Sequence, residues 1–473
     1  MTASDKLNAI FADRWDEPAL ICDLRQFTYC ELYCHAAGIA AWMAEQGCRA
    51  GDTVALRLPN GWPFAVTYLS CLIGCYKIVP VNPELNSVDQ AYIISRTQPS
   101  ILIEDQHLLT ELPTLAVEAP DFIYPDEIVA AIFFTSGTTG KPKGVCHSLD
   151  SLVGNALRFN ETLGIDANVR QYHVLPMAYM AGFLNTLLSP WLAGGVVLLG
   201  PRFRPSDALR FWQRPIQWNA NSIWLTPTLA AVLARMSRDP EVASQVGRSL
   251  RHIFCATAPL PEATRKAFYE VFGSPLQESY GMSEVLLVAA QTREEAKCVA
   301  SVGRLLPGVK ISYRNVTDLC TEELVIHTPW ALKGYLLEDR ELSPLLNDGG
   351  MPSGDQCSVE GLQLVITGRL KDLIIRGGLN VSPIAVEEVI LREDGVEEVA
   401  VVGLPHDFWG EIIVACMVAK RDEDLPILLE AIQSRCTLEL VEGMRPDRYI
   451  WLENLPHAST GKVQKHVLRG RLT

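Results

Sequence analysis

Positive charge is scarce in this sequence. Its 473 residues include 41 lysine and arginine residues against 55 aspartate and glutamate residues, which gives a net charge of −14. A protein that coats nucleic acid needs a basic surface to neutralise the phosphates. We therefore expect no nucleic-acid partner, and any anionic substrate would need a locally basic or amide-lined site.

Long apolar runs are also missing. The most apolar stretch, residues 64–79, is interrupted by Gly74, Tyr76 and Lys77 and is too short to cross a bilayer. The chain begins Met-Thr-Ala-Ser-Asp, without a basic segment that leads into an apolar one, so no signal peptide is visible. We expect no integral membrane association and a cytoplasmic location.

The cysteines lack the arrangement of a disulfide framework. There are 13 of them, an odd number scattered over the chain, which is typical of a reducing compartment. Two C-x3-C pairs, Cys30/Cys34 and Cys71/Cys75, fall in helix-like segments. No second ligand pair follows at the spacing of a zinc site, so we interpret both pairs as core packing.

The length exceeds what one hydrophobic core usually organises, so two or more domains are expected. In the first half, helical patterns alternate with short apolar, β-branched runs, which favours an α/β fold with largely parallel sheets. The predicted helices are residues 31–46 and 62–75. The predicted strands are residues 53–57, 78–81, 172–175, 196–199, 222–225 and 252–255.

The last hundred or so residues have the pattern of a separate unit. A boundary near residues 368–372 is indicated, because a glycine followed by a charged run often marks a hinge. We therefore predict domains at residues 1–368 and 369–473. In the second unit, we expect helices at 386–391, 427–435 and 465–468 and strands at 399–402, 413–418 and 449–452.

A dense polar loop follows the predicted buried strand 128–134. Residues 135–144 combine hydroxyl groups, three glycines and two lysines, which together can surround an anion with N–H, O–H and ammonium groups. A Walker A loop is excluded because Thr135 occupies the first glycine position and Pro142 follows Lys141. The alternative is an ordinary polar surface loop. The predicted phosphate-binding residues are Thr135, Ser136, Gly137, Thr138, Thr139, Gly140 and Lys143.

This loop resembles the signature loop of the adenylate-forming superfamily, which comprises acyl-CoA synthetases, peptide-synthetase adenylation domains and luciferases. Residues 27–32, near the N-terminus, are similar to the family's opening strand-to-helix segment, and further motifs follow the loop in the family's order at residues 280–284, 353–355, 368–372 and 460–462. The sequences of these segments are most similar to those of acyl-CoA synthetases. The resemblance implies a large N-terminal domain of α/β subdomains with mostly parallel sheets and a small β-barrel-like part. It also implies a small, mobile α+β C-terminal domain.

The resemblance implies an ATP site, and the chemistry of each side chain in it suits the part of the nucleotide that it would bind. Tyr280 offers an aromatic face to adenine, and Asp355, assisted by Arg369, can accept bonds from the ribose hydroxyls. Ser283 offers a hydroxyl to the α-phosphate, and Glu284 is a hard oxygen ligand suited to Mg²⁺. The alternatives are a core tyrosine, a turn aspartate and a solvated glutamate. Arg376 completes the implied ATP-binding set.

Lys462 is implied to bind both the substrate carboxylate and the α-phosphate. A cation there lowers the repulsion between two anions. At about 4 Å and an effective dielectric constant of about 20, one such charge pair is worth about 4 kcal/mol. That equals roughly a thousandfold in rate before the desolvation of the lysine is counted. The alternative is an ordinary surface lysine.

The second half-reaction is implied by the C-terminal unit. In the family, this domain rotates about a hinge, matched here by Lys371, and brings a Gly-Gly segment, matched by Gly377 and Gly378, to the active site. Residues 402–411 favour coenzyme A as the acceptor. The alternatives are a carrier-protein phosphopantetheine thiol and, less favoured, a non-catalytic adenylate-binding protein. A luciferase role would be a rare outcome within the superfamily.

The acid is expected to lack an α-amino group. In the family, amino-acid activation uses an aspartate in the segment matched by residues 178–182, and residues 178–191 contain no acidic residue. An unpaired buried ammonium group would cost several kcal/mol. We predict a small to medium acid with a mainly apolar or aromatic body, and Phe183 and Trp224 belong either to its pocket or to the core. The expected pocket residues are Tyr179, Ala181, Ala256, Gly281 and Val285.

Three positions depart from the family's usual residues. Ser283 and Ser353 stand where threonine is more frequent, and both keep the hydroxyl group. Tyr179 stands where related synthetases commonly have histidine, at the entry between the ATP and acyl sites. We therefore expect the gating of that entry to differ.

Overall fold

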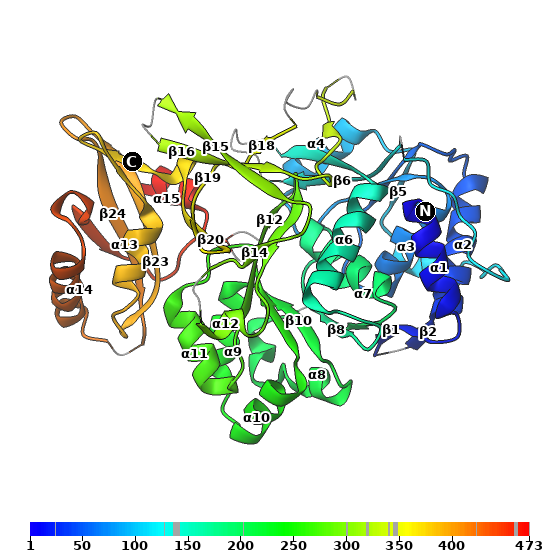
Figure 1. Ribbon diagram of the computed structural model, residues 1–473, viewed down its shortest axis with the longest axis horizontal. Helices are drawn as coiled ribbons and strands as arrows, with labels where there is room; N and C mark the ends of the chain where they lie inside the picture. Colours follow the sequence, from blue (N-terminus) through cyan, green and yellow to red (C-terminus); the bar gives the residue numbers. More distant parts are fainter. Residues whose placement is uncertain are drawn as a thin grey trace.

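The computed structural model describes residues 1–23, 25–126, 128–135, 142–201, 203–298, 301–317, 321–338, 341–343, 349–421, 423–457 and 462–472. A large N-terminal part contains three sheets, and a smaller C-terminal part contains a fourth (Figure 1). The C-terminal part lies beside the edge of the large central sheet.

The central sheet has mixed strand directions. Its strands run parallel from β12 to β1 and antiparallel towards both edges. The spatial order is β19 (Asp355–Glu360), β20 (Gln363–Arg369), β14 (Arg304–Leu305), β13 (Leu286–Ala290), β12 (Gln277–Met282), β11 (His252–Cys255), β10 (Ser222–Leu225), β8 (Arg170–His173), β9 (Val196–Leu199), β1 (Pro18–Cys22) and β2 (Arg25–Thr28).

Two further sheets complete the N-terminal part. The first has the order β17 (Gly334–Tyr335), β7 (Lys143–Ser148), β6 (Val129–Thr135), β4 (Lys77–Pro80), β3 (Thr53–Leu56) and β5 (Ile101–Ile103). The second is antiparallel, with the order β15 (Lys310–Val316), β16 (Thr321–His327) and β18 (Met351–Pro352). The first sheet carries the polar loop at its β6–β7 connection.

Helices cover the sheets, and several of them begin at side-chain caps. At the start of α2, Thr28 Oγ1 accepts from the Glu31 N–H at 3.1 Å, and the Glu31 carboxylate accepts from the Thr28 N–H at 2.9 Å. The N-terminal helices are α1 (Ala3–Asp13), α2 (Tyr29–Glu45), α3 (Trp62–Ile73), α4 (Ser87–Thr97), α5 (Gln106–Glu111), α6 (Leu149–Leu163), α7 (Ser189–Leu192), α8 (Gln213–Gln217), α9 (Pro227–Met236), α10 (Pro240–Ser249), α11 (Glu262–Phe272) and α12 (Glu295–Cys298).

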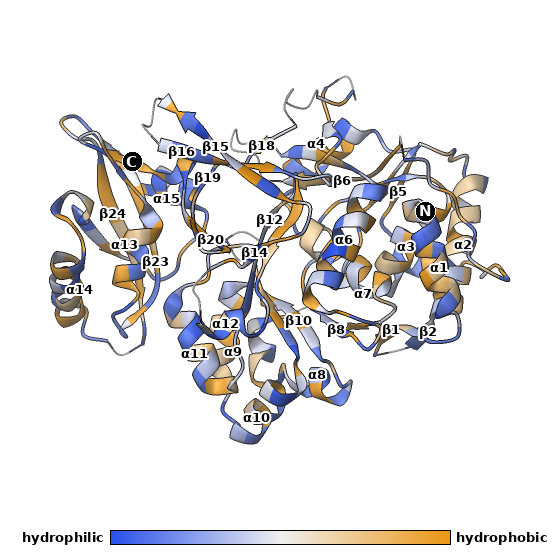
Figure 2. Cartoon of the chain, viewed as in Figure 1, coloured by the Kyte–Doolittle hydropathy of each residue, from blue (hydrophilic) through white to orange (hydrophobic). Residues whose placement is uncertain are grey.

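The C-terminal part is an α+β unit with its own core. Its strands are β21 (Ile374–Arg376), β22 (Leu379–Val381), β23 (Val396–His406), β24 (Gly410–Ala419) and β25 (Arg448–Trp451). Its helices are α13 (Pro383–Ile390), α14 (Leu425–Glu439) and α15 (Lys465–Leu472). Figure 2 shows apolar residues concentrated on β24, whose residues from Ile413 to Val418 are buried.

The predicted α/β class with a large first and a small second domain is confirmed, although the sheets are mixed rather than mostly parallel. Three predicted strands, 196–199, 222–225 and 252–255, have the observed bounds of β9, β10 and β11. In the described part of the chain, no helix combines the length and apolar character that a bilayer span requires. The domain boundary stays a prediction; residue 368 lies near the end of β20.

Candidate active site

The β6–β7 hairpin fixes the two ends of the expected phosphate loop. Thr135 ends β6, half-buried, and pairs with Lys143, which begins β7 and is exposed. Five predicted residues lie outside the described residues, so phosphate binding stays a prediction. These are Ser136, Gly137, Thr138, Thr139 and Gly140.

Asp355 is the centre of a buried polar cluster. The Tyr280 hydroxyl donates to Asp355 Oδ2 at 2.6 Å, and Arg369 Nε lies 3.0 Å from Asp355 Oδ1. Asp355 begins β19 directly opposite Arg369 on β20, and its N–H donates to Ser353 Oγ at 3.0 Å. Both carboxylate oxygens are therefore held, yet each keeps further acceptor capacity for a ligand hydroxyl.

Tyr280 has a hydrogen-bonding role that the sequence did not predict. Its side chain is buried at the end of β12, and burial together with the Asp355 charge raises the pKa of its hydroxyl. The hydroxyl therefore remains a hydrogen-bond donor to Asp355 at physiological pH. The sequence suggested only an aromatic face for adenine, because nothing local to Tyr280 indicates a partner 75 residues away.

Lys462 is brought to this cluster from the C-terminal domain. The pKa of Lys462 is lowered to about 8, chiefly by burial and then by the charges of Arg369 and Lys371, while Asp355 acts in the opposite direction. The chain around Lys462 is fixed by a bridge between His457 and Val463. The predicted motif residues Thr460 and Gly461 lie outside the described residues.

The Ser283–Glu284 turn follows β12 and is fastened from the neighbouring sheet. His147 Nε2 lies 2.6 Å from the Ser283 carbonyl oxygen, and the Leu332 N–H donates to the Glu284 carbonyl at 2.7 Å. The Tyr335 hydroxyl donates to Glu284 Oε1 at 3.0 Å. Burial lowers the pKa of His147 to about 4, so its ring is neutral at physiological pH and donates to the carbonyl through Nε2.

The donor set at this turn suits an ion that arrives with phosphates. Glu284 is half-buried, and only its Oε1 is bonded to Tyr335. Among the described residues, no group of three or more histidine, cysteine, aspartate or glutamate side chains is gathered for a metal. Mg²⁺ commonly uses one or two carboxylates together with substrate phosphates and water. Glu284 fits that arrangement.

Of the expected acyl-pocket residues, Ala256, Gly281 and Val285 lie at or just after the ends of β11 and β12, and Tyr179 and Ala181 lie in the connection between β8 and β9. Tyr179, Ala181 and Ala256 are half-buried, whereas Val285 is fully buried in the main core. Gly281 sits at a register shift in β12, where a Cβ would lie 2.3 Å from the Leu286 carbonyl oxygen, so only glycine fits. The role of these residues in acid binding stays a prediction.

Tyr179 has a polar partner that the sequence did not reveal. Its hydroxyl accepts from Asn82 Nδ2 at 3.1 Å, and Asn82 lies just after β4 in the other sheet. The π-helical segment that begins at Ala181 packs closely, since a Cβ on Gly182 would lie 2.0 Å from the Pro176 carbonyl oxygen. Tyr179 is thus tethered across two sheets.

Phe183 and Trp224 belong to the core. The Phe183 ring stacks on Tyr68 with centroids 4.1 Å apart. The Trp224 ring lies 4.5 Å from the Phe254 centroid and 5.6 Å from that of Phe159. Both side chains are almost completely buried, which favours the core alternative that the sequence left open.

The expected thiol-side residues form a separate group on the C-terminal domain. Gly377 and Gly378, with φ of +57° and +84°, turn the chain between β21 and β22. A Cβ on Gly377 would lie 2.8 Å from the Trp409 ring. Arg376 packs over that ring at 4.7 Å and pairs with Asp447 at 2.7 Å. The structure therefore holds Arg376 beside Gly377, and its ATP-binding role stays a prediction.

Lys371 lies where the chain passes from the N-terminal part to the C-terminal part. It is exposed in a 3₁₀ turn, Leu370–Asp372, between β20 and β21. The Leu370 N–H donates to the Gly354 carbonyl at 2.9 Å, which ties the turn to the Asp355 loop.

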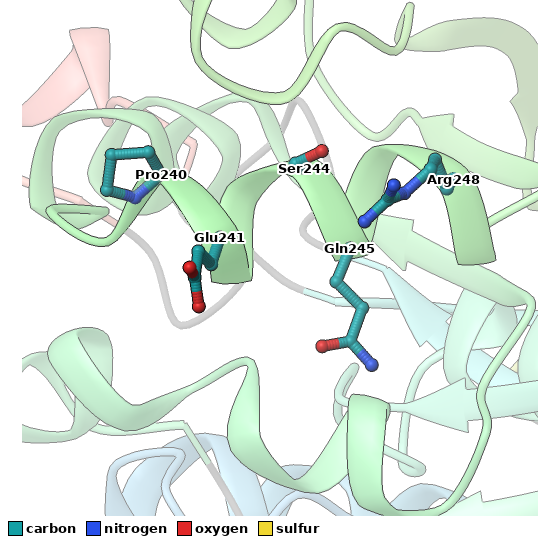
Figure 3. A pocket seen from close by; sticks show the side chains of 5 residues that line it. All are labelled: Pro240, Glu241, Ser244, Gln245 and Arg248. Atoms are coloured by element: carbon teal, nitrogen blue, oxygen red, sulfur yellow. The ribbon is translucent and has the colours of Figure 1, made fainter.

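A separate shallow pocket on the outer face of α10 includes none of the predicted site residues (Figure 3). It is lined by Pro240, Glu241, Ser244, Gln245 and Arg248.

A two-domain α/β chain that brings a lysine of its small domain to an aspartate–arginine cluster of its large domain has the architecture of adenylate-forming enzymes. Residues 9–336 match the family described as AMP-binding enzyme, and residues 385–462 match the AMP-binding enzyme C-terminal domain. The chain belongs to the AMP-binding enzyme family.

Relatives of full length support the same class. A long-chain-fatty-acid–CoA ligase of Mycobacterium tuberculosis is 28% identical, with 94% of this chain and 93% of the relative covered. A 2-succinylbenzoate–CoA ligase of Bacillus licheniformis is 27% identical, with 96% of each chain covered. The ATP-bound MatB structure from Rhodopseudomonas palustris shares the fold, with a TM-score of 0.87, 24% identity and coverage of 100% and 99%.

These findings confirm the predicted class, an AMP-forming acid–thiol ligase of the acyl-CoA synthetase type within the adenylate-forming superfamily. ATP and coenzyme A are the co-substrates of that class.

Proposed function

We propose that this enzyme activates a small to medium carboxylic acid without an α-amino group as its acyl-adenylate and transfers the acyl group to coenzyme A. The observation that carries the proposal is the approach of Lys462 to Asp355 and Arg369. Adenylation is the step in which a mobile cation has most to contribute, because a carboxylate must approach a phosphate.

In the proposed adenylation step, each residue of the site has its own role. Asp355, held by Tyr280 and Arg369, accepts hydrogen bonds from the ribose hydroxyls and fixes the nucleotide. Lys462 stabilises the charge shared by the carboxylate and the α-phosphate, and Ser283 donates a hydroxyl there. Mg²⁺, when bound at Glu284, neutralises phosphate charge. Bringing the two anions together is then favourable, because their charges are met before the bond forms.

The thioester step needs a second orientation of the C-terminal domain. Gly377 and Gly378 lie at an exposed turn of that domain, and Lys371 lies in the segment on which it would rotate. Rotation withdraws Lys462 and brings the glycine turn to the adenylate. Coenzyme A is the proposed acceptor in preference to a carrier-protein phosphopantetheine, and the CoA-ligase names of the full-length relatives support this choice.

The proposed acid follows from the absence of a partner for an ammonium group. Residues 178–191 contain no acidic side chain. The polar group at Tyr179 is a hydroxyl bonded to Asn82, which leaves an ammonium group without a counter-charge there. The names of relatives, such as fatty-acid and 2-succinylbenzoate ligases, also describe acids without an α-amino group.

Matched substrate pairs test this assignment. Pyrophosphate release is measured with phenylpropionate and phenylalanine, which differ only by the α-amino group. We expect turnover to favour phenylpropionate by at least about a hundredfold, since an unpaired buried ammonium costs several kcal/mol. Benzoate and octanoate extend the series in size. A preference for phenylalanine would contradict the proposed acid class.

A further inference from the structure

The backbone of Tyr335 is fixed on both sides. On one side, β17 pairs with β7, and Tyr335 lies opposite Val145. On the other side, the Tyr335 N–H donates to Ser343 Oγ and the Ser343 N–H donates to the Tyr335 carbonyl, each at 2.9 Å. A Cβ on Gly334 would lie 2.6 Å from the Ser343 carbonyl oxygen. This close approach fixes the direction in which the tyrosine side chain leaves the backbone.

The Tyr335 hydroxyl bonds the carboxylate of Glu284, a residue whose backbone is held by other groups. The Leu332 N–H bonds the Glu284 carbonyl, and His147 bonds the Ser283 carbonyl, so the turn itself does not depend on Tyr335. Within the described ranges, Tyr335 is the one side chain that donates a hydrogen bond to the Glu284 carboxylate. Its hydroxyl therefore sets the rotation of that carboxylate and leaves Oε2 unbonded to it.

The same ring also receives Lys143 from the end of the phosphate loop. Lys143 Nζ lies 5.5 Å from the Tyr335 ring centroid, a cation–π distance. In the described structure, Lys143 lies over the ring, Glu284 accepts from the hydroxyl, and the two side chains form no ion pair with each other. A direct ion pair would neutralise both groups, whereas separate contacts with Tyr335 keep one cation and one carboxylate for ligands.

We propose that Tyr335 is a positioning residue that orients Glu284 for the metal that accompanies ATP. This inference rests on the proposed role of Glu284 as a Mg²⁺ ligand. Replacing a partner that orients a metal-binding side chain typically lowers metal affinity about 10- to 100-fold. Tyr335 acts through Glu284 and needs no contact with the acid.

The test removes only the hydroxyl group. Tyr335→Phe keeps the ring and its contact with Lys143. Binding of Mn²⁺ to the enzyme with a non-reactive ATP analogue, followed by electron paramagnetic resonance, should weaken about 10- to 100-fold. The Mg²⁺ requirement of pyrophosphate release should rise similarly, and the KM for the acid should stay unchanged. Tyr313→Phe, which removes a hydroxyl on exposed β15, is the matched control and should change neither.

Glu284→Gln separates failure of this inference from failure of the assigned metal role. Unchanged Mn²⁺ affinity in Tyr335→Phe, with weakened affinity in Glu284→Gln, overturns the role of Tyr335 alone. Unchanged affinity in both variants removes the metal role and the inference together. If Tyr335 acts through Glu284, adding Tyr335→Phe to Glu284→Gln should weaken binding by less than about twofold, and a fully additive loss contradicts it.

Discussion

Lys462 carries a charge that its surroundings disfavour. It is half-buried, two nearby cations repel it, and only Asp355 among the named neighbours favours its ammonium form. Such a group gains most when anions arrive, because the substrate carboxylate and the α-phosphate supply the missing counter-charge. The perturbation of this lysine is therefore what an adenylation site requires.

Replacing Lys462 should separate the two half-reactions. In Lys462→Ala, we expect acid-dependent ATP–pyrophosphate exchange to fall by about a thousandfold, because one charge pair near 4 kcal/mol is lost. Thioester formation from supplied acyl-adenylate should be largely kept, since it uses the other domain orientation. Normal exchange in the variant would contradict the role of Lys462.

The pH dependence of exchange reports the same group. The pKa of Lys462 is lowered to about 8, so its ammonium form is present below that pH and is lost above it. We expect kcat/KM for the acid in ATP–pyrophosphate exchange to fall about tenfold per pH unit above about pH 8. Exchange is measured without coenzyme A, whose thiol would add its own titration. A profile that stays flat to about pH 10 would refute this assignment.

For single residues, the chemical role of a side chain could be predicted from the sequence, but its interaction partners in the fold could not. Asp355 and Arg369 were identified as a nucleotide pair, and the structure joins them at 3.0 Å. The contacts of His147 and Tyr335 with residues 283–284 could not be foreseen. They depend on the pairing of β7 with β17, which are almost 190 residues apart and carry no local signal of it.

At the scale of elements, the 3₁₀ turn Leu370–Asp372 is the segment on which rotation would depend. Lys371→Pro fixes one backbone dihedral there. We expect adenylation to persist while thioester formation falls at least about tenfold, measured as separate half-reactions. Equal loss in both half-reactions, in a variant that circular dichroism shows to be folded, would count against a hinge.

Lys371→Ala is the matched control for the proline variant. It removes the charge and leaves the backbone free to rotate, so thioester formation should persist. Because the Lys371 charge helps to lower the pKa of Lys462, its removal should move the alkaline fall of exchange to higher pH. An unshifted profile would mean that the two lysines do not interact in solution.

Elements were predictable where apolar periodicity was strong. The buried runs 196–199, 222–225 and 252–255 have the observed bounds of strands, because parallel strands covered on both faces are apolar throughout. Strand β12 was not predicted. Its sequence Gln-Glu-Ser-Tyr-Gly-Met is mostly polar, and two of its buried side chains have partners outside the strand: Gln277 Nε2 donates to the Gln291 carbonyl, and the Tyr280 hydroxyl donates to Asp355.

At the scale of the whole molecule, two of the contacts between described residues of the two domains are polar. Arg235 on α9 pairs with Glu397 on β23, and Ser382 Oγ donates to the Thr367 carbonyl at 3.0 Å. Both side chains of the ion pair are more than one-third exposed, and such pairs are worth about 0–1 kcal/mol. Breaking this ion pair would therefore cost little if the C-terminal domain takes the proposed second orientation.

The large-scale organisation was predictable because it rests on motifs in a fixed order. The order of the loop at 135–144, the turn at 280–284 and Asp355 indicated one site. Among the described residues, Tyr280 on β12 bonds Asp355 on β19, and His147 on β7 bonds the Ser283 carbonyl. Which acid this assembly accepts was not predictable. That choice depends on side-chain packing around Tyr179, whose tether to Asn82 links β4 to the segment before the π-helical turn.

The proposed acid–CoA ligase activity is tested most directly by measuring the amounts of all products in one reaction series. The enzyme is incubated with ATP, Mg²⁺ and a panel of acids without α-amino groups, with coenzyme A, with a phosphopantetheinylated carrier protein or with neither. For the preferred acid, the account predicts pyrophosphate, AMP and the acyl-CoA thioester in equal amounts, with sustained turnover only when coenzyme A is present. Thioester formed only on the carrier protein, or sustained turnover that coenzyme A does not affect, would contradict it.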